Sequence, residues 1–174
     1  MEKIDIKLLN DNVFDTIGKE WMLVTAGTID HHNTMTASWG CLGWLWGKPV
    51  AVAFIRPERY THEFIEANDM LTLSFLGHGK EARSIYNLCG SRSGRDCDKT
   101  KEAGLLPVAT PNGSTTFEQA RLTLECRKLY KGSIEEQNFI DKSLTQWYGA
   151  DKGGYHDVYV LEITGAYTAT KDGE

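Results

Sequence analysis

The sequence predicts a mainly β fold: an antiparallel β-barrel, closed or split, with short peripheral helices. Its apolar runs have the length of strands, and turn residues separate them at irregular intervals. Residues 70–76 alternate leucine or phenylalanine with threonine or serine, which indicates an antiparallel strand with one buried face. This pattern favours a barrel over a parallel sheet of alternating strands and helices. We expect a single domain over residues 1–174.

The polar turn at residues 30–33 separates the first two predicted strands. Residues 21–26 form a mostly apolar run of strand length that closes at Gly27, and residues 34–39 form the second strand. Side chains alternate between the two faces of a strand. One face of the second strand carries Thr34, Thr36 and Ser38, and the other carries Met35, Ala37 and Trp39. One face is therefore polar without being charged.

The third predicted strand, VAVAFI, follows a predicted loop at residues 40–48 and ends at Arg56-Pro57. Its nearly continuous apolar character predicts burial on both faces. Thr61 is placed to cap a short helix. The remaining predicted elements are a strand at 70–76, a helix at 80–88, a strand at 122–130, a helix at 135–147 and a strand at 158–167, with a turn at Asn112-Gly113.

Composition excludes several classes of protein. The formal net charge is −5 and basic residues are scattered, which argues against a nucleic-acid partner. The N-terminus lacks the apolar core of a secretory signal, and no run reaches the about 18 apolar residues of a membrane span. We therefore expect a soluble, cytoplasmic protein.

Cysteine and histidine spacing gives no metal motif. The four cysteines match neither a redox pair nor a zinc site, so we expect free, buried or half-buried thiols. His31 and His32 are adjacent, so their side chains point in different directions, and no further ligand completes a set. We expect no bound metal ion.

Two arginines lie close together on a stiff turn. Arg56 and Arg59 flank Pro57, whose fixed φ limits the backbone, so both guanidinium groups can face one anion. Tyr60 and Thr61 add hydroxyl groups, and the N-terminus of the following helix adds free N–H groups. These donors predict a phosphate site. The alternative is an exposed turn whose arginines pair with nearby carboxylates such as Glu58 or Glu63.

The polar strand before this turn suits a flat heterocycle. An isoalloxazine ring has a dimethylbenzene end to bury and a pyrimidine end that needs hydrogen bonds from uncharged groups. Thr36, Ser38 and the backbone N–H groups beside Ala37 and Ser38 can supply these bonds, and Trp39 can wall one edge. The alternative is a solvent-exposed face. The dinucleotide-binding, P-loop and zinc-protease motifs G-x-G-x-x-G, Walker A and H-E-x-x-H do not occur.

Four motifs resemble the flavin reductase-like family of FMN-binding split β-barrels, and within it the flavoredoxin-type proteins. They are NTMTASWG at 33–40, RPERYT at 56–61, SGRDCDK at 93–99 and GGYHDVYVLEITGAY at 153–167, and the likeness covers about residues 14–167. The resemblance implies a split barrel and a homodimer. It also implies one FMN per subunit near the dimer interface, reduced by NADH or NADPH.

The resemblance also assigns roles to residues. It places Thr36, Ala37, Ser38 and Trp39 along the flavin ring and Arg59 with Thr61 at the FMN phosphate, with Arg56 and Tyr60 as further candidates. Ser93 and Lys99 would lie near the cofactor, the lysine offsetting the negative charge of reduced flavin. His156 would face the nicotinamide or acceptor pocket. The alternatives are that Lys99 is a solvated helix charge and that His156 is structural.

These observations lead to a functional hypothesis. We expect an FMN-dependent NAD(P)H oxidoreductase that passes electrons to free flavin, a ferric complex or a protein. Hydride transfer between two stacked rings needs no protein acid or base, so no indispensable catalytic side chain is expected. The alternatives are a flavoredoxin-like electron carrier reduced by another protein and a non-enzymatic flavin-binding module.

Two further residue groups have less defined roles. Trp44 and Trp46 are expected to serve packing or a dimer surface, with a carbohydrate-stacking platform as the alternative. Cys41 lies two residues after Trp39, close enough along the chain to take part in electron transfer.

Overall fold

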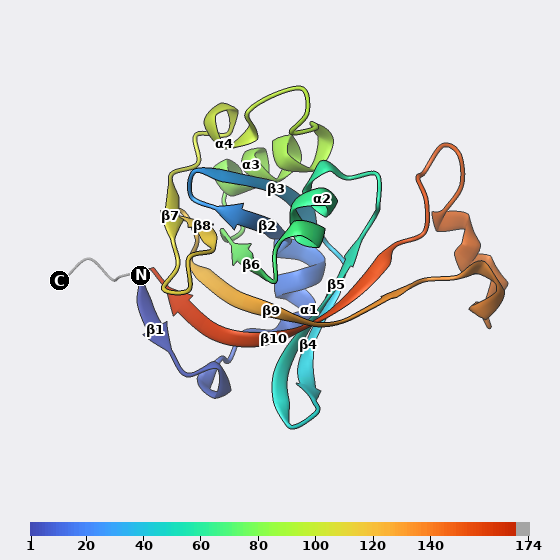
Figure 1. The fold of residues 1–174 in the computed structure, drawn as a ribbon, viewed down its shortest axis with the longest axis horizontal. Coiled ribbons are helices and arrows are strands. Elements are labelled where there is room, and N and C mark those ends of the chain that lie inside the picture. Colours follow the sequence, from blue (N-terminus) through green and yellow to red (C-terminus); the bar gives the residue numbers. More distant parts are fainter. Residues whose placement is uncertain (170–174) are drawn as a thin grey trace.

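The computed structural model describes residues 1–169, which form one antiparallel sheet with helices packed against it (Figure 1). The order of the hydrogen-bonded strands is β3-β2-β6-β9-β10-β5-β4, and β1 pairs with the end of β10. The strands are β1 Glu2–Ile4, β2 Met22–Thr28, β3 His31–Ala37, β4 Gly40–Leu45, β5 Lys48–Ile55, β6 Met70–Phe75, β9 Leu122–Ser133 and β10 Asp157–Thr168. Within the described residues β3 and β4 do not pair, so the sheet is not closed. The predicted antiparallel split barrel with short helices is confirmed.

Two hairpins shape the region around the site. In the β2–β3 hairpin Thr25 lies opposite Thr34, and their hydroxyl groups are hydrogen-bonded at 2.8 Å. The predicted loop at 40–48 is wrong, because residues 40–45 form strand β4 and pair with β5 in a hairpin. Its two-residue turn has φ of 51° at Trp46 and 72° at Gly47, the positive values that tight antiparallel hairpins require. The sequence did not show this turn because Trp is an unusual residue in the first position.

The predicted burial of β5 on both faces is wrong. Ala51, Ala53 and Ile55 are fully buried, whereas the intervening Val52 and Phe54 are half-buried. One face of the strand packs in the core, and the other is partly open. Phe54 is therefore free to line a cavity.

The helices also differ from the prediction in part. They are α1 Val13–Asp15, α2 Tyr60–Ala67, α3 Lys80–Ser91 and α4 Lys99–Glu102. The N-cap of α2 is Arg59 and not Thr61, whose side chain turns into the core instead. The predicted helix at 135–147 is replaced by two short 3₁₀ helices, Glu136–Asn138 and Lys142–Trp147. Neither contains a buried residue, so no packed apolar face stabilises a longer helix there.

The core has two parts. The larger part fills the sheet interior, and the smaller one lies under α3, where Ile85, Tyr86 and Cys89 pack with Leu23 and Phe117. A short hairpin of β7 Pro107–Ala109 and β8 Thr115–Phe117 covers this second part. No helix among residues 1–169 is both long and apolar enough to cross a membrane.

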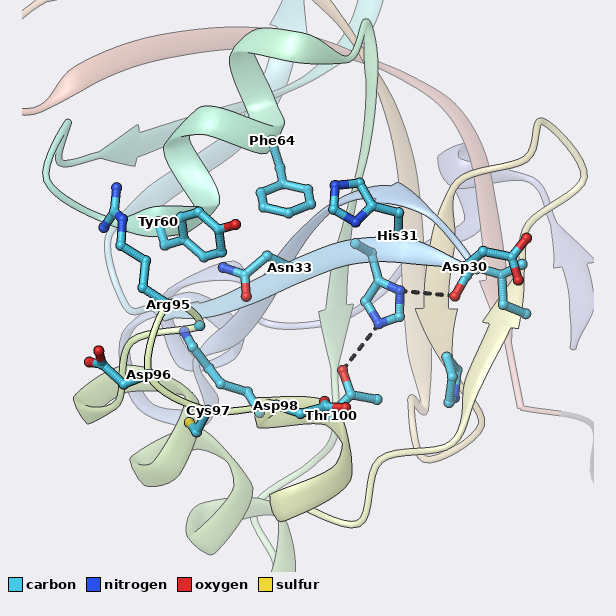
Figure 2. A pocket seen from close by; sticks show the side chains of 15 residues that line it. Asp30, His31, Asn33, Tyr60, Phe64, Arg95, Asp96, Cys97, Asp98 and Thr100 are labelled. Carbon is cyan, nitrogen blue, oxygen red and sulfur yellow. Dashed lines mark hydrogen bonds between the residues drawn. The ribbon is translucent and has the colours of Figure 1, made fainter.

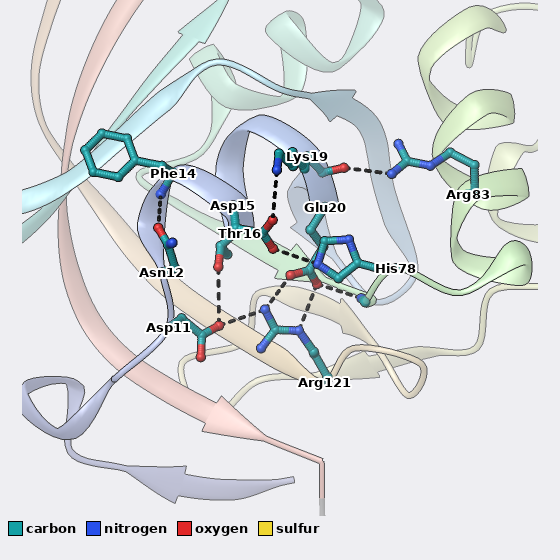
Figure 3. Close-up of polar contacts among 11 residues, drawn as sticks. Asp11, Asn12, Phe14, Asp15, Thr16, Lys19, Glu20, His78, Arg83 and Arg121 are labelled. Carbon is teal, nitrogen blue, oxygen red and sulfur yellow. Dashed lines mark hydrogen bonds and ion pairs between the residues drawn. The ribbon is translucent and has the colours of Figure 1, made fainter.

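A buried ion pair fixes the segment that leads into β2 (Figure 3). The Glu20 side chain is 0% exposed and accepts hydrogen bonds from the Arg121 guanidinium and from the Gly77 N–H at 2.6 Å. Arg121 also pairs with Asp11 at 2.7 Å. These contacts attach a π-helical turn, Thr16–Glu20, to the strands beside it.

Candidate functional site

A cavity of about 180 Å³ at the end of β3 brings together side chains from three segments that are distant in the sequence. They are the end of β3 with the two residues after it, the end of β5 with the turn before α2, and the residue before β10. The predicted site residues among them are Thr36, Ala37, Ser38, Trp39, Arg56, Arg59 and His156. We name this space the ring cavity. Phe54 also lines it, a role that was not predicted because the residue lies in an apolar run that resembles a core strand.

The open edge of β3 faces the cavity with backbone groups. Within the described residues β2 is the only strand that pairs with β3, and the Thr34 carbonyl turns away from it to accept a hydrogen bond from Lys99 Nζ at 2.7 Å. Backbone direction alternates along an antiparallel strand, so the N–H and C=O of Thr36 also turn to the open side. The Thr36 hydroxyl donates to the Tyr86 carbonyl at 2.6 Å. The face is therefore covered by α3 and is not the solvent-exposed face of the alternative.

Ser38 offers a free hydroxyl at the same cavity. No residue among 1–169 forms a hydrogen bond with its side chain, and the residue is half-buried. Beside it, Trp39 is 39% exposed and lies edge-on to Trp147, with ring centres 5.6 Å apart. An uncharged polar donor thus stands next to an aromatic wall, as the strand pattern predicts.

Arg59 and Lys99 meet at the C-terminal end of α3. Arg59 Nη2 and Lys99 Nζ both donate to the Cys89 carbonyl, each at 3.2 Å. Lys99 is only 4% exposed, so the alternative of a solvated helix charge is wrong. Burial, together with the Arg59 charge, lowers the pKa of Lys99 to about 8. Burial and the Arg56 charge also lower the pKa of Arg59.

The two arginines of the turn have different partners. Arg56 donates to the carbonyls of Lys152, Gly154 and Trp147, in a long loop before β10. Neither arginine forms an ion pair with a carboxylate in the described part of the chain, so the alternative of pairing with Glu58 or Glu63 is not observed. Glu63 pairs with Arg95, and Glu58 accepts the Gly154 N–H. Arg59 thus has no local neutralising partner.

Thr61, Tyr60 and Ser93 lie outside the ring cavity. Thr61 is 0% exposed, and its hydroxyl accepts a hydrogen bond from Asn33 Nδ2 at 2.8 Å. The Ser93 hydroxyl accepts the Arg95 N–H at 3.2 Å within a turn. Tyr60 and Lys99 line a second cavity of about 620 Å³ (Figure 2). Arg56 and Arg59 thus line the ring cavity, and Tyr60 and Lys99 line the second cavity. Thr61 and Ser93 line neither, and the two cavities are linked by the Cys89 carbonyl that Arg59 and Lys99 share.

The second cavity has an aromatic wall on one side. Tyr60 and Phe64 lie with ring centres 5.2 Å apart, and His31 lies 4.9 Å from Phe64 (Figure 2). His32 is not part of this aromatic wall; its Nε2 lies 3.1 Å from the Thr100 hydroxyl, elsewhere in the lining of the same cavity. Within residues 1–169 no group of three or more His, Cys, Asp or Glu side chains is arranged to hold a metal ion.

His156 is enclosed by aromatic rings. It is 7% exposed, Nδ1 lies 3.3 Å from the Tyr148 hydroxyl, and its ring centre is 5.2 Å from that of Trp39. Burial, and then the Arg56 charge, lower the pKa of His156 to about 4. The imidazole is therefore neutral at pH 7, the form in which it can donate one hydrogen bond.

An apolar cavity of about 760 Å³ adjoins the ring cavity, with which it shares Ser38, Trp39 and Phe54. Phe14 and Cys41 also line it. Cys41 is exposed, whereas Cys89 and Cys126 are buried and Cys97 is half-buried; all four thiols are free. The ring cavity alone is smaller than the roughly 300–1,000 Å³ of ordinary ligand sites. Together the two spaces fit a flat group with one polar and one apolar end.

Comparison with known proteins agrees with this geometry. The family profile described as flavin reductase like domain matches residues 14–174. The sequence has no significant match among curated proteins.

Solved structures share the fold at low sequence identity. An FMN-binding protein from Thermus thermophilus with bound 1-cyclohex-2-enone is 19% identical with a TM-score of 0.66, and the match covers 97% of this chain and 81% of that one. A flavoredoxin from Methanosarcina acetivorans is 21% identical with a TM-score of 0.66, with coverage of 100% and 79%. The NADH:FAD oxidoreductase SgcE6 of Streptomyces globisporus is 18% identical with a TM-score of 0.63, with coverage of 86% and 75%.

These structures support the fold, and the profile match, which spans most of the sequence, decides the family. The predicted resemblance is thereby confirmed: this chain belongs to the flavin reductase-like family.

Proposed function

We propose that this protein is an FMN-dependent NAD(P)H oxidoreductase, formed by one flavin reductase-like domain across the chain. The observation that carries the proposal is the ring cavity. It places uncharged donors of β3, an aromatic wall and the unneutralised cation Arg59 beside an apolar space. Bound FMN would supply the redox chemistry, taking a hydride from a nicotinamide and passing electrons to an acceptor.

The residues of the ring cavity have separate proposed tasks. The Ser38 hydroxyl and the Thr36 N–H donate to the polar edge of the flavin ring, and the small Ala37 side chain permits close approach. Trp39 and Phe54 exclude water from the ring. The neutral His156 imidazole presents a hydrogen bond to the incoming nicotinamide or acceptor.

The tail of the cofactor has its own proposed partners. Arg59 and Lys99 supply positive charge for the phosphate, and Tyr60 and Ser93 add hydroxyl groups nearby. Thr61 contributes indirectly, because its bond with Asn33 fixes the first turn of α2 against β3. The Arg56 guanidinium is engaged with three carbonyl groups, so we propose that Arg59 and Lys99, rather than Arg56, supply the charge for the phosphate.

We also propose a homodimer with the flavin near the interface. Phe14, which lines the apolar cavity, is 90% exposed, and Trp44, which lines a neighbouring cavity that shares Leu42 with it, is 60% exposed. A second copy of the chain would cover them. Sedimentation velocity tests this point, and a monomer at micromolar concentration would contradict it.

The function is tested with the purified protein and added flavin. We expect FMN to bind, FAD to bind more weakly, and the flavin absorbance to bleach when NADH or NADPH is added without oxygen. Flavin binding without bleaching would instead support the flavoredoxin-like electron carrier. A protein that binds neither flavin would leave only a non-enzymatic module.

A further inference from the structure

The loop between β9 and β10 projects beyond the ends of these two strands at one side of the molecule (Figure 1). It spans residues 134–156 and contains the two 3₁₀ helices, neither of which has a buried residue. The rings of Phe139, Tyr148 and Tyr155 pack on one another within the loop, with the Tyr148 and Tyr155 ring centres 4.5 Å apart. The side-chain hydrogen bonds that join the loop to the rest of the protein are concentrated at residues 147–154.

Arg56 forms one half of the attachment. Its Nη1 donates to the carbonyls of Lys152 and Gly154, the latter at 3.1 Å, and its Nη2 donates to the Trp147 carbonyl at 3.2 Å. The guanidinium also lies 5.4 Å from the centre of the Tyr148 ring. One side chain thus fixes both ends of the segment 147–154.

Glu58 forms the other half. It accepts the Gly154 N–H through Oε1. Partial burial raises the pKa of Glu58, but this hydrogen bond and the Arg56 charge outweigh it and bring the pKa below its ordinary value. Pro57 lies between the two residues and fixes their separation. The loop is held by a donor and an acceptor from the same short turn.

Gly153 shows how closely the loop passes between them. Its φ is +91°, and a Cβ built on it would lie 2.6 Å from Arg56 Nη1 and 2.7 Å from Glu58 Oε1. A side chain at this position would collide with both halves of the attachment. We define Arg56, Glu58 and Gly153 as the loop clasp.

The clasp holds two residues that pack against the lining of the ring cavity. Trp147 lies against Trp39, and the Tyr148 hydroxyl lies 3.3 Å from His156 Nδ1. We infer that Arg56 is a positioning residue for the second ring, the nicotinamide or the aromatic acceptor, because it holds Trp147 and Tyr148 against the cavity residues Trp39 and His156. The inference rests on the proposed function, and it assigns Arg56 a role distinct from that of the phosphate donor Arg59.

The first experiment measures hydrogen exchange and needs no flavin. We expect Arg56→Gln and Gly153→Ala to raise amide exchange in residues 147–154 at least about tenfold, with the rest of the protein protected as in the parent. Glu58→Ala should do the same, while Glu58→Gln, which keeps the acceptor oxygen, should not. Arg127→Gln is the matched control, since this arginine pairs with Glu162 on the strand surface. Parent-like exchange in Arg56→Gln would overturn the clasp.

The second experiment separates positioning from phosphate binding. In Arg56→Gln we expect the Kd for FMN to change less than about threefold and the KM for the nicotinamide to rise at least about fivefold. Arg56→Lys keeps the charge but not the two guanidinium nitrogens that reach separate carbonyls, so it should resemble Arg56→Gln. A tenfold loss of FMN affinity that Arg56→Lys restores would make Arg56 a phosphate ligand and overturn the inference. An unchanged KM would overturn the positioning role.

The two experiments test the loop clasp and the proposed function independently. If the parent protein binds no flavin, the proposed function falls, and with it the assignment of the second ring. The exchange measurement still decides whether Arg56 and Glu58 hold the loop.

Discussion

The Arg59 guanidinium and the Lys99 ammonium donate to one oxygen atom, the carbonyl of Cys89, each at 3.2 Å. This carbonyl belongs to the last turn of α3, where the helix dipole favours positive charge. Neither cation pairs with a carboxylate in the part of the chain that the structure describes. One buried and one half-buried cation, neither of them paired with a carboxylate among the described residues, favour an anionic ligand beside them.

Removal of Arg59 should weaken flavin phosphate binding. Arg59→Ala is expected to cost about 1.5–3 kcal/mol, the range for a lost hydrogen bond to a charged group, which raises the Kd for FMN roughly 10- to 150-fold. Fluorescence titration measures the Kd, with Arg127→Ala as the control, because this arginine pairs with Glu162 and lines neither cavity. Riboflavin, which lacks the phosphate, should show a much smaller change. Equal affinities for FMN in parent and variant would remove Arg59 from the site.

Lys99 should make FMN affinity fall at alkaline pH. Its pKa is about 8 in the folded protein, so the ammonium loses its proton between pH 7.5 and 9.5 and ceases to attract the phosphate. We expect the Kd for FMN to rise several-fold over this range. In Lys99→Met the dependence should be nearly flat. The same slope in both proteins would exclude Lys99 as its source.

As the pH rises, the stability of the flavin-free protein should increase, whereas the affinity for FMN falls. The folded pKa of Lys99 lies below the ordinary 10.5, so between pH 8 and 10.5 the unfolded chain binds more protons than the folded protein. Stability relative to Lys99→Met should therefore rise by roughly 1–2 kcal/mol from pH 8 to 9.5. Urea unfolding of both proteins at the two pH values measures this difference.

His156 should reduce stability under mildly acidic conditions. Its folded pKa of about 4 lies below the ordinary 6.5, so the stability present above pH 6.5 is lost as the pH falls toward 4. Between pH 6.5 and 4.5 we expect a loss of about 2 kcal/mol relative to His156→Gln. Comparison of the two proteins cancels the titration of the carboxylates. Parallel pH profiles would place the imidazole in a more solvated environment than the structure shows.

Trp39 should influence the emission of bound flavin. An indole beside the ring quenches flavin fluorescence, so Trp39→Ala should increase the emission of the complex or shift its reduction potential. Trp46→Asn is the control, because Trp46 lies at the tip of the β4–β5 hairpin and Asn accepts its positive φ. If emission and potential both match the parent, Trp39 does not contact the ring.

Removal of one partner of the Glu20–Arg121 pair should destabilise the fold. Arg121→Met leaves the fully buried Glu20 carboxylate without its counter-charge and should cost about 3–5 kcal/mol. Glu20→Gln should cost less, because the Arg121 side chain is 40% exposed and keeps its pair with Asp11. The double variant should be more stable than the sum of the single losses implies. Lys19→Ala, at an exposed neighbouring position, should change the urea midpoint little. Additive losses would show that the two residues act independently.

Local pattern in the sequence determined the sheet and the strand that carries the polar face. The alternation survives from Thr34 to Ala37, but β3 begins at His31, inside the predicted turn at 30–33, and ends before Ser38 and Trp39. The strand at 70–75 and the helix from Lys80 are also present. These features depend on side-chain periodicity over a few residues, which the chain displays directly. The roles of the residues assigned to the flavin ring and to the phosphate remain predictions.

Tertiary structure alone decided which partners those residues have. The acceptor shared by Arg59 and Lys99 is a backbone carbonyl, and Arg56 reaches carbonyls more than 90 residues further along the chain. Carbonyls are present at every residue, so no sequence pattern marks the ones that will be close in space. The burial of Lys99 and Thr61 also depends on how α3 and α2 pack onto β3, because burial is a property of the assembled layers and not of the segments themselves.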